Sequence, residues 1–233
     1  MKKTLCLWMV LALSLTFMLT SCSDKPDAGR ICYQSNGDGT CGIGLYVKDP
    51  EQDMVSNLIY MLFARFMAGA TYGERLDSDV TEYVIPESSK KGDTVTAVGQ
   101  YGFENWLGLK SVVIHGKVTE IEQYAFRGCA FLQKVDMAYG VTTIGAYAFS
   151  GCESLETIAL PDSVTSIGTS AFEGCSSLHS IEIPASVTSI GRMAFADCNS
   201  LIHIYYAGTK EEWEAISKDA NVPNTVTIHY NYN

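Results

Sequence analysis

A 23-residue unit repeats five times in succession between residues 95 and 209, and no other feature constrains the fold as strongly. Each unit opens with Val-Thr, carries a small residue before a central phenylalanine, and ends in Leu-x-x-Ile/Val-x-apolar. Four units have a cysteine three positions after the phenylalanine, and Trp106 takes that place in the first. The units begin at Val95, Val118, Val141, Val164 and Val187.

The end of each unit predicts a short strand with one buried face. In Leu178-His-Ser-Ile181-Glu-Ile183 apolar and polar residues alternate with a period of two. One such strand cannot bury its apolar face alone, so stacked units must supply one another's core at a spacing of about 4.8 Å. We expect the Ala-Phe pair to lie opposite the strand in a short helical turn, and the glycine before it to need a positive φ. The fold class is therefore a repeat solenoid of the α/β class, with mostly short parallel strands and helical turns.

An irregular unit precedes the five regular ones. Residues 80–86 match residues 155–161, but the connection from there to the next unit is six residues longer. We interpret residues 87–94 as a lengthened surface turn, which costs little free energy. The solenoid is thus predicted over residues 80–209.

Both ends of such a stack must be covered, because the terminal units expose strand edges and core. At the C-terminal end, in residues 210–233, Thr209-Lys-Glu-Glu212 is a capping box that predicts a helix to about Ser217. Trp213 and Ile216 lie on one face of this helix and would cover the last unit, and residues 226–230 predict a closing strand.

Residues 31–79 are predicted to form an N-terminal capping region with one helix over about 50–68. Asp49-Pro50 is a favourable helix start. The helix is apolar over most of its circumference, so a second membrane segment is the alternative interpretation. Asn57 and Arg65 interrupt a stretch already too short to span a bilayer, and we prefer a helix packed on the open end of the repeats.

The first 21 residues have the features of a secretory signal. Lys2 and Lys3 precede an uncharged run of signal-peptide length. The run ends in Leu-Thr-Ser-Cys22, which resembles the bacterial lipobox, and the resemblance implies cleavage before Cys22 and its lipidation. Residues 22–30 would then form a lipid-anchored tether. The alternative is an ordinary secretory signal followed by a chance cysteine.

The charge of the chain excludes two classes of partner. Its formal net charge is −10, and removal of residues 1–21, which hold two lysines and no acid, gives −12. Nucleic-acid binding requires a basic face, and so does electrostatic attachment to anionic lipid. We therefore expect no nucleic-acid partner, and contact with the membrane only through the N-terminal lipid.

Units of the form VTSIGxxAFxxCxSLxxIxIP resemble the BspA-like leucine-rich repeats of bacterial surface proteins. The resemblance covers about residues 80–209. It implies a leucine-rich-repeat fold and a surface or secreted role, often in adhesion to host proteins or other cells. It supplies no catalytic residue. Together with the signal, it predicts an extracytoplasmic lipoprotein on the outer membrane or cell surface of a Gram-negative bacterium.

The cysteines of the mature chain fall into two groups. Cys32 and Cys41 flank a turn-rich octet, and in an oxidising compartment we expect a disulfide between them. The same octet faintly suggests a calcium loop, but it lacks the later bidentate acid. The repeat cysteines stand in single file and cannot converge on zinc, so we interpret them as buried, reduced, small apolar residues. No metal and no cofactor are expected.

The sequence contains no recognisable catalytic constellation. Serine-hydrolase, zinc-protease and phosphate-loop motifs are absent from it. The four histidines fall at different repeat positions, and nothing in the sequence suggests that any two meet. We therefore expect a protein that is not an enzyme. A site in residues 30–79 is the remaining enzymatic alternative.

The strand residues that alternate with the buried ones should line a concave face. The candidate binding residues on it are Lys134, Asp136, Thr157, Ser180, Glu182, His203 and Tyr205. They either bind a partner or merely fill a pleated surface. An extracellular protein is the preferred partner, and a glycan that stacks on exposed aromatic side chains is the alternative.

Overall fold

A computed structural model describes residues 32–35, 40–44, 81–88 and 94–232 of the chain. The predicted signal peptide, the tether with Cys22 and the predicted helix over about 50–68 lie outside the described residues. Residues 89–93 of the lengthened turn also lie outside them.

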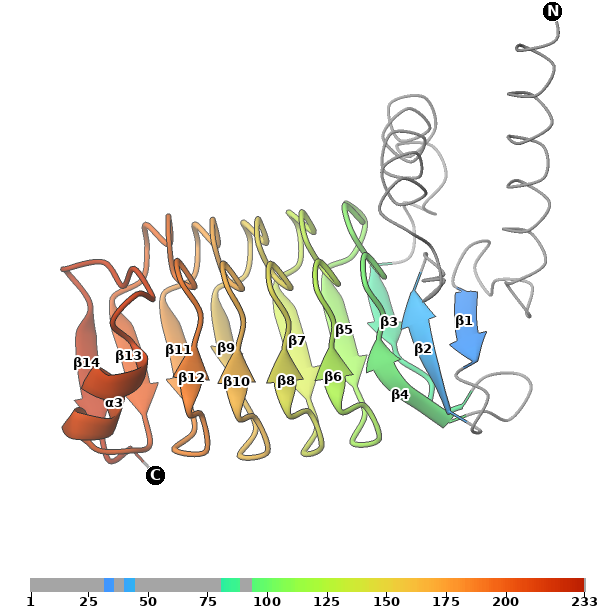
Figure 1. Cartoon of the computed structure of the whole chain (residues 1–233). Coiled ribbons are helices and arrows are strands. Elements are labelled where there is room, and N and C mark those ends of the chain that lie inside the picture. The colour runs from blue at the N-terminus through green and yellow to red at the C-terminus, as the bar shows by residue number, and fades with distance from the viewer. Residues whose placement is uncertain (1–31, 36–39, 45–80, 89–93, 233) are drawn as a thin grey trace, which may run out of the picture.

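The described part is a solenoid of stacked turns with parallel strands, as predicted (Figure 1). Its first side is a seven-stranded sheet in the order β1 (Cys32–Ser35), β2 (Thr40–Gly44), β4 (Thr94–Val98), β6 (Glu120–Ile121), β8 (Thr143–Ile144), β10 (Ser166–Ile167) and β12 (Ser189–Ile190). All pairs in this sheet are parallel except the antiparallel pair β1–β2.

The second side carries the strands predicted from the Leu-x-x-Ile pattern. It is divided into two sheets. The first is β3 (Glu82–Val84), β5 (Ser111–Ile114) and β7 (Lys134–Met137), and the second is β9 (Thr157–Ala159), β11 (Ser180–Ile183), β13 (His203–Tyr206) and β14 (Thr227–Tyr230). No ladder joins β7 to β9, although the two strands are neighbours in the stack (Figure 1). The units keep the 23-residue register at this junction, where β6 and β8 pair Glu120 with Thr143, but the strands of the second side form no ladder.

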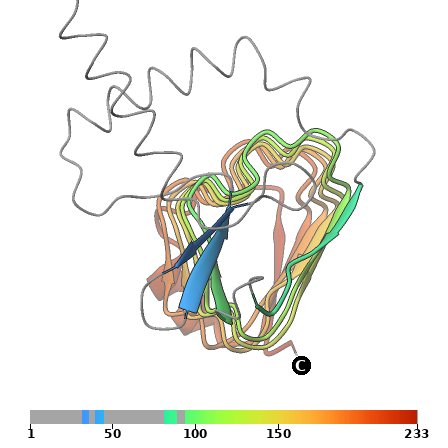
Figure 2. The ribbon, with the colours of Figure 1, turned by 90° about the vertical axis from the view of Figure 1, so that its right-hand side faces the viewer.

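The Ala-Phe segments form a third hydrogen-bonded side and not the helical turns that we predicted. The backbone N–H of Phe126 donates to the carbonyl of Ala148 in the next unit at 2.7 Å, and Phe149 donates to Ala171 in the same way at 2.8 Å. Each segment is a turn in which alternate backbone N–H groups donate to the following unit, and the N–H groups between them donate within the turn, as Ala148 does to Gly145. The three sides give the solenoid its triangular outline in end view (Figure 2).

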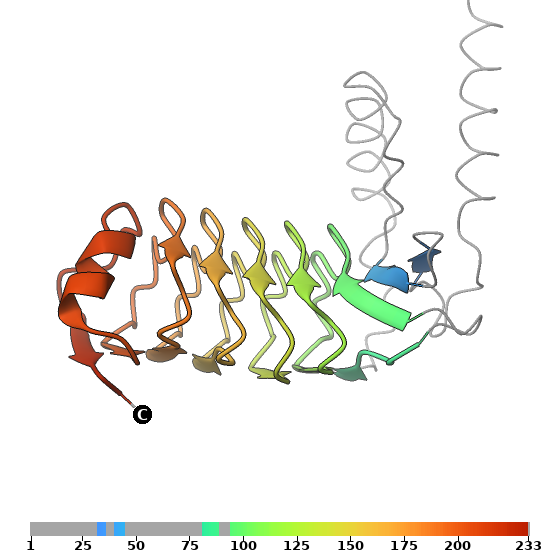
Figure 3. The ribbon, with the colours of Figure 1, turned by 60° about the horizontal axis from the view of Figure 1, so that its bottom comes forward.

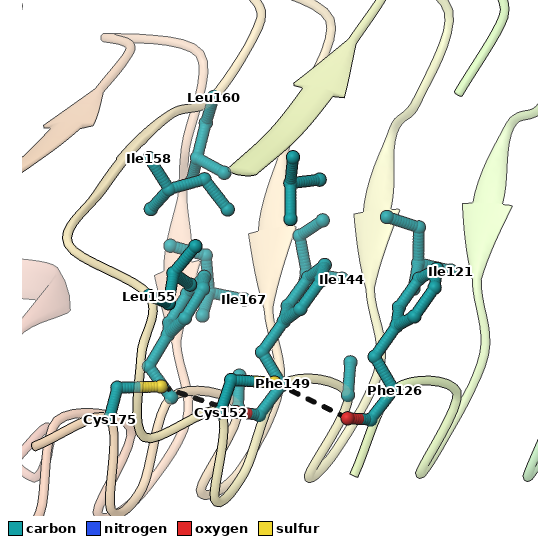
Figure 4. Packing of buried hydrophobic residues seen from close by; sticks show 14 of the residues in the cluster. Ile121, Phe126, Ile144, Phe149, Cys152, Leu155, Ile158, Leu160, Ile167 and Cys175 are labelled. Carbon is teal, nitrogen blue, oxygen red and sulfur yellow. Dashed lines mark hydrogen bonds between the residues drawn. The ribbon is translucent and has the colours of Figure 1, made fainter. Parts of the chain in front are cut away.

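One continuous hydrophobic core fills the inside of this triangle. Its centre is a column of five stacked phenylalanine rings, with centroids 5.1–5.9 Å apart and interplanar angles of 10° or less. All five rings are fully buried. Figure 4 labels two of them, Phe126 and Phe149. The residues of the column are Phe103, Phe126, Phe149, Phe172 and Phe195.

The glycine that four of the five units carry before the pair of a small residue and the central phenylalanine does not adopt a positive φ, so that prediction was wrong. It is needed for close approach instead. A Cβ on Gly168 would lie 2.6 Å from the backbone carbon of Gly145 in the preceding unit, and one on Gly191 would lie 2.5 Å from that of Gly168. The positive φ belongs to the residue two positions later, with values from 53° to 62°. These residues are Tyr101, Tyr124, Tyr147, Ser170 and Met193.

The C-terminal segment closes the stack as predicted. Helix α3 (Lys210–Ile216) has Thr209 as N-cap and a capping box with Glu212. Trp213 is buried and its ring lies 5.4 Å from that of Tyr206 in the last regular unit. Figure 3 shows the helix at this end of the solenoid. Residues 219–220 then accept hydrogen bonds from Met193 and Phe195, so the cap follows the path of a further turn.

Candidate binding face

The solvent side of the strands β3, β5, β7, β9, β11, β13 and β14, which we call the outer face, carries all the predicted binding residues. Along β11 the buried Ile181 and Ile183 alternate with the half-buried Ser180 and the exposed Glu182. Parallel pairing places Ser180 beside Thr157 and His203, and Glu182 beside Tyr205. These side chains therefore form two rows that run along the solenoid.

The predicted residues Lys134 and Asp136 stand apart from the others. They lie on β7, on the far side of the interrupted ladder. The ammonium of Lys134 and the carboxylate of Asp136 form an ion pair at 2.7 Å, with side chains that are 68% and 48% exposed. An exposed pair of this kind contributes about 0–1 kcal/mol and leaves each charge largely satisfied by the other. In this part of the outer face, the two charged side chains are paired with each other.

Four ring-bearing residues gather at the C-terminal end of the outer face: His203, Tyr205, His229 and Tyr232. We call them the aromatic–histidine cluster. The ring of Tyr205 stacks on that of His229 with centroids 4.6 Å apart and 14° between planes, and lies 4.7 Å from the ring of Tyr232. His203 Nδ1 and His229 Nε2 are 3.1 Å apart, within hydrogen-bonding distance. His203 and His229 therefore meet, which nothing in the sequence suggested.

Strand β14 explains why these residues meet. It pairs in parallel with β13, so that Thr227 lies beside His203 and His229 beside Tyr205. Sequence reasoning identified the strand but neither His229, which the strand contributes to the cluster, nor Tyr232, which follows the strand. The signal was the match of Ile204-x-Tyr206 to Ile228-x-Tyr230 at a spacing of 24 residues, one more than the repeat.

The Tyr205 ring contacts three other rings of the cluster. It stacks on His229 of β14, lies 4.7 Å from Tyr232 and lies 5.9 Å from His203. The residue beside Tyr205 on β11 is Glu182, whose side chain is exposed. An aromatic side chain and a carboxylate thus lie next to each other on the outer face.

A second aromatic feature, missed at the sequence level, lies on the third side. The rings of Tyr101, Tyr124 and Tyr147 stack in a ladder with centroids 4.9 and 5.0 Å apart. The guanidinium of Arg127 lies 5.3 Å from the Tyr124 centroid and 3.4 Å from a carboxylate oxygen of Glu104. Burial raises the pKa of the Tyr101 phenol, with a smaller contribution from Tyr124. Since the rings occupy one another's faces, this ladder offers edges and hydroxyl groups to a partner.

The repeat cysteines are buried and unpaired, as predicted. Each thiol donates to the carbonyl of the phenylalanine in the preceding unit, at 3.0–3.3 Å (Figure 4). Burial raises the pKa of the Cys129 and Cys198 thiols to about 12. It also raises the pKa of Cys152 and Cys175 well above the usual value, helped by the neighbouring thiols. Such thiols are poor nucleophiles and do not form a reactive site.

The β1–β2 hairpin does not bring Cys32 and Cys41 opposite each other. Its register pairs Cys32 with Gly44 and Ser35 with Cys41. Three residues along a strand correspond to about 10 Å, which exceeds the Cα separation of about 7 Å that a disulfide can span. The predicted disulfide requires another register of this hairpin and stays a prediction.

The described residues contain neither a cluster of metal ligands nor a membrane-spanning helix. In residues 32–35, 40–44, 81–88 and 94–232, no three or more histidine, cysteine, aspartate or glutamate side chains are arranged to hold a metal ion. Within the same residues, none of the helices combines the length and the apolar character needed to cross a membrane.

Comparison with known proteins identifies the repeat. The family described as "BspA type Leucine rich repeat region" matches residues 93–220 in six copies. The chain belongs to this family. Its BspA-type match starts near the first regular unit and extends into the C-terminal cap, in agreement with the path of the cap in the structure. A comparison with the curated proteins found no match.

Solved leucine-rich-repeat structures share the fold. A leucine rich cell surface protein from Faecalibacterium prausnitzii A2-165 is 27% identical with a TM-score of 0.60, over 82% of this chain and 42% of that one. A leucine-rich repeat protein from Bacteroides ovatus ATCC 8483 is 26% identical with a TM-score of 0.51, over 65% and 42%. This chain thus spans about two fifths of each of these two structures. The T. pallidum leucine rich repeat protein is 23% identical with a TM-score of 0.63, over 89% and 82%, and supports the fold alone.

Proposed function

We propose that this BspA-type protein is a lipid-anchored surface protein that binds an extracellular protein through its outer face and catalyses no reaction. The observation that carries the proposal is the aromatic–histidine cluster at one end of that face. The family match, the cell-surface relative and the signal ending at Cys22 support the location. The surface lipoprotein would be anchored in the outer membrane, with the repeats outside.

The free energy of binding should concentrate in this cluster. Tyrosines are enriched among the interface residues that dominate binding, because a large ring with a polar end loses little entropy on binding. The rest of the outer face carries small residues such as Thr157, Ala159 and Ser180, the exposed Val84 and Val113, the acids Glu82 and Glu182, and the Lys134–Asp136 pair. Such residues contribute shape complementarity and exclude water.

A glycan is the second candidate ligand, and one observation favours it. Tyr205 is the ladder neighbour of Glu182, whose exposed carboxylate could accept hydrogen bonds from sugar hydroxyls. A flat sugar face packed on an aromatic ring beside a hydrogen-bonding carboxylate would use both groups. The two candidates differ in the ligand and share the residues.

We expect Tyr205→Ala to weaken binding of the partner by at least about 2 kcal/mol, or about 30-fold in Kd. The protein would be screened on arrays of extracellular proteins and of glycans, and the Kd of each hit measured for both forms. The matched control is Tyr139→Ala, which removes a 75%-exposed tyrosine away from the cluster. A hit that loses affinity only with Tyr205→Ala supports this face. Hits that tolerate the change, or no hits in either array, contradict it.

The proposed lipid anchor at Cys22 is tested separately from the binding face. We expect protein recovered from membranes to begin at Cys22 and to carry acyl chains, since several chains give stable attachment. Mass spectrometry of the N-terminal peptide distinguishes this from the ordinary secretory signal. An unacylated N-terminus at another residue would show that the chain is secreted and not anchored.

A further inference from the structure

The two histidines of the cluster hold one ring nitrogen each within hydrogen-bonding distance of the other. His203 Nδ1 and His229 Nε2 lie 3.1 Å apart, and both residues are half-buried. Their strands β13 and β14 are joined by a four-residue ladder, which fixes the two Cα positions. The rings are tilted by 52° with centroids 5.1 Å apart. Backbone pairing therefore holds the nitrogens together.

This separation is close to that of two ligands on one metal ion. Two nitrogens each about 2.0–2.1 Å from zinc at the tetrahedral angle stand about 3.3 Å apart. In the neutral pair one ring donates its N–H to the other. A metal ion can replace that proton if the donor ring changes tautomer and carries the proton on its other nitrogen. Each ring would also have to turn by about 35°, because the two nitrogens face each other in the hydrogen bond and their lone pairs must converge on a point beside the N···N line.

We propose that His203 Nδ1 and His229 Nε2 together bind a divalent transition-metal ion. Imidazole suits Zn²⁺, Ni²⁺ and Cu²⁺, and Cu²⁺ should bind most tightly of the three. Because the described residues hold no group of three ligating side chains, water or a donor from a partner completes the coordination. The site goes beyond the proposed function, since metal can bind whether or not a partner is present.

The surroundings of the pair favour a cation. The exposed carboxylate of Glu182 lies one strand away on β11, and the formal net charge of the chain is −10. The Tyr205 ring lies 5.9 Å from that of His203 and 4.6 Å from that of His229, and Tyr232 lies 4.7 Å from Tyr205. These phenols add no positive charge beside the pair. No lysine or arginine lies on β11, β13 or β14.

Titration with Zn²⁺ followed by isothermal calorimetry tests this proposal. We expect the protein to bind one ion, and His203→Gln or His229→Gln to weaken binding at least about tenfold, because even loss of an outer-shell partner costs that much. The matched control is His179→Gln, which removes an exposed histidine of the preceding unit and should leave binding unchanged.

Three results would overturn the proposal. One is no binding by the unaltered protein at about 1 mM Zn²⁺. Another is equal binding by the His203→Gln and His229→Gln forms, which would place the ion elsewhere. The third is an equal loss with His179→Gln. Far-UV circular dichroism checks that each variant is folded, and if His229→Gln disturbs β14, then His203→Gln on the inner strand decides.

Discussion

Raising the pH from 7 to about 9.5 should lower the free energy of unfolding by about 5–6 kcal/mol, provided the protein is kept reduced. The reason is the column of four buried thiols, Cys129, Cys152, Cys175 and Cys198. Their pKa in the folded state is raised to about 12 in two cases and well above the usual value in the others. In the unfolded chain a thiol ionises near pH 8.5.

The sign follows from which state binds more protons. A folded-state pKa above the unfolded one contributes stability that is complete below about pH 8.5 and is lost as the pH rises toward 12. At pH 9.5 the unfolded state gains about 1.4 kcal/mol from each ionised thiol, whereas the folded state keeps all four protonated. Guanidinium unfolding followed by circular dichroism at pH 7, 8.5 and 9.5 measures this. Ionisation of tyrosines, including Tyr101 with its raised pKa, acts in the same direction only at higher pH.

Cys152→Ala provides the control for this prediction. It removes one of the four thiols, so the loss of stability between pH 7 and 9.5 should shrink by about a quarter, whatever the variant's stability at pH 7. A free energy of unfolding that stays constant over this range would mean that the thiols titrate normally in the folded protein. The assignment of the four repeat thiols as buried would then be incorrect.

Phe149→Ala should destabilise the protein by about 3–5 kcal/mol, as is typical when a buried aromatic ring is deleted from a core. Phe149 is the middle ring of the phenylalanine column, with neighbours 5.2 and 5.5 Å away on either side. Its deletion leaves a cavity between Phe126 and Phe172 that the stacked backbone cannot collapse to fill. The same denaturant experiment at pH 7 gives the value.

Phe131→Ala is the matched control. It removes the same side chain from a site that is 54% exposed, where surface substitutions change stability by about 0.5 kcal/mol or less. Similar losses for the two variants would contradict the assignment of the column as the core. So would a loss below about 1 kcal/mol for Phe149→Ala.

The solenoid and its strands on the second side could be predicted because five successive units carry the same apolar pattern, which requires a strand with one buried face. Alternation such as Ile181-Glu-Ile183 is visible wherever a strand is long enough to show period two. The first sheet was missed for the opposite reason. Most of its strands are only two residues long, as in Thr143–Ile144, and two residues cannot display a period.

Features outside the consensus also escaped prediction. The tyrosine ladder occupies a repeat position that holds Ser170 and Met193 in the last two units, so it is not part of the motif. The glycine prediction failed because two requirements of glycine look alike in a sequence. Close approach to the preceding unit and a positive φ both select it, and only the backbone path distinguishes Gly168 from Gly174. The meeting of His203 and His229 depended on a spacing of 24 residues where the repeat has 23.

Strand pairing on the outer face has a consequence for how such a protein can change its target. Side chains there occupy a regular grid, about 4.8 Å apart between strands and about 6.6 Å apart along each strand. Positions such as Thr157, Ser180 and Glu182 take no part in the core, so each can be exchanged without disturbing the packing beneath it. Mutation can therefore rewrite the pattern of charge, shape and hydrogen bonding one grid point at a time, while the buried columns keep the chain folded.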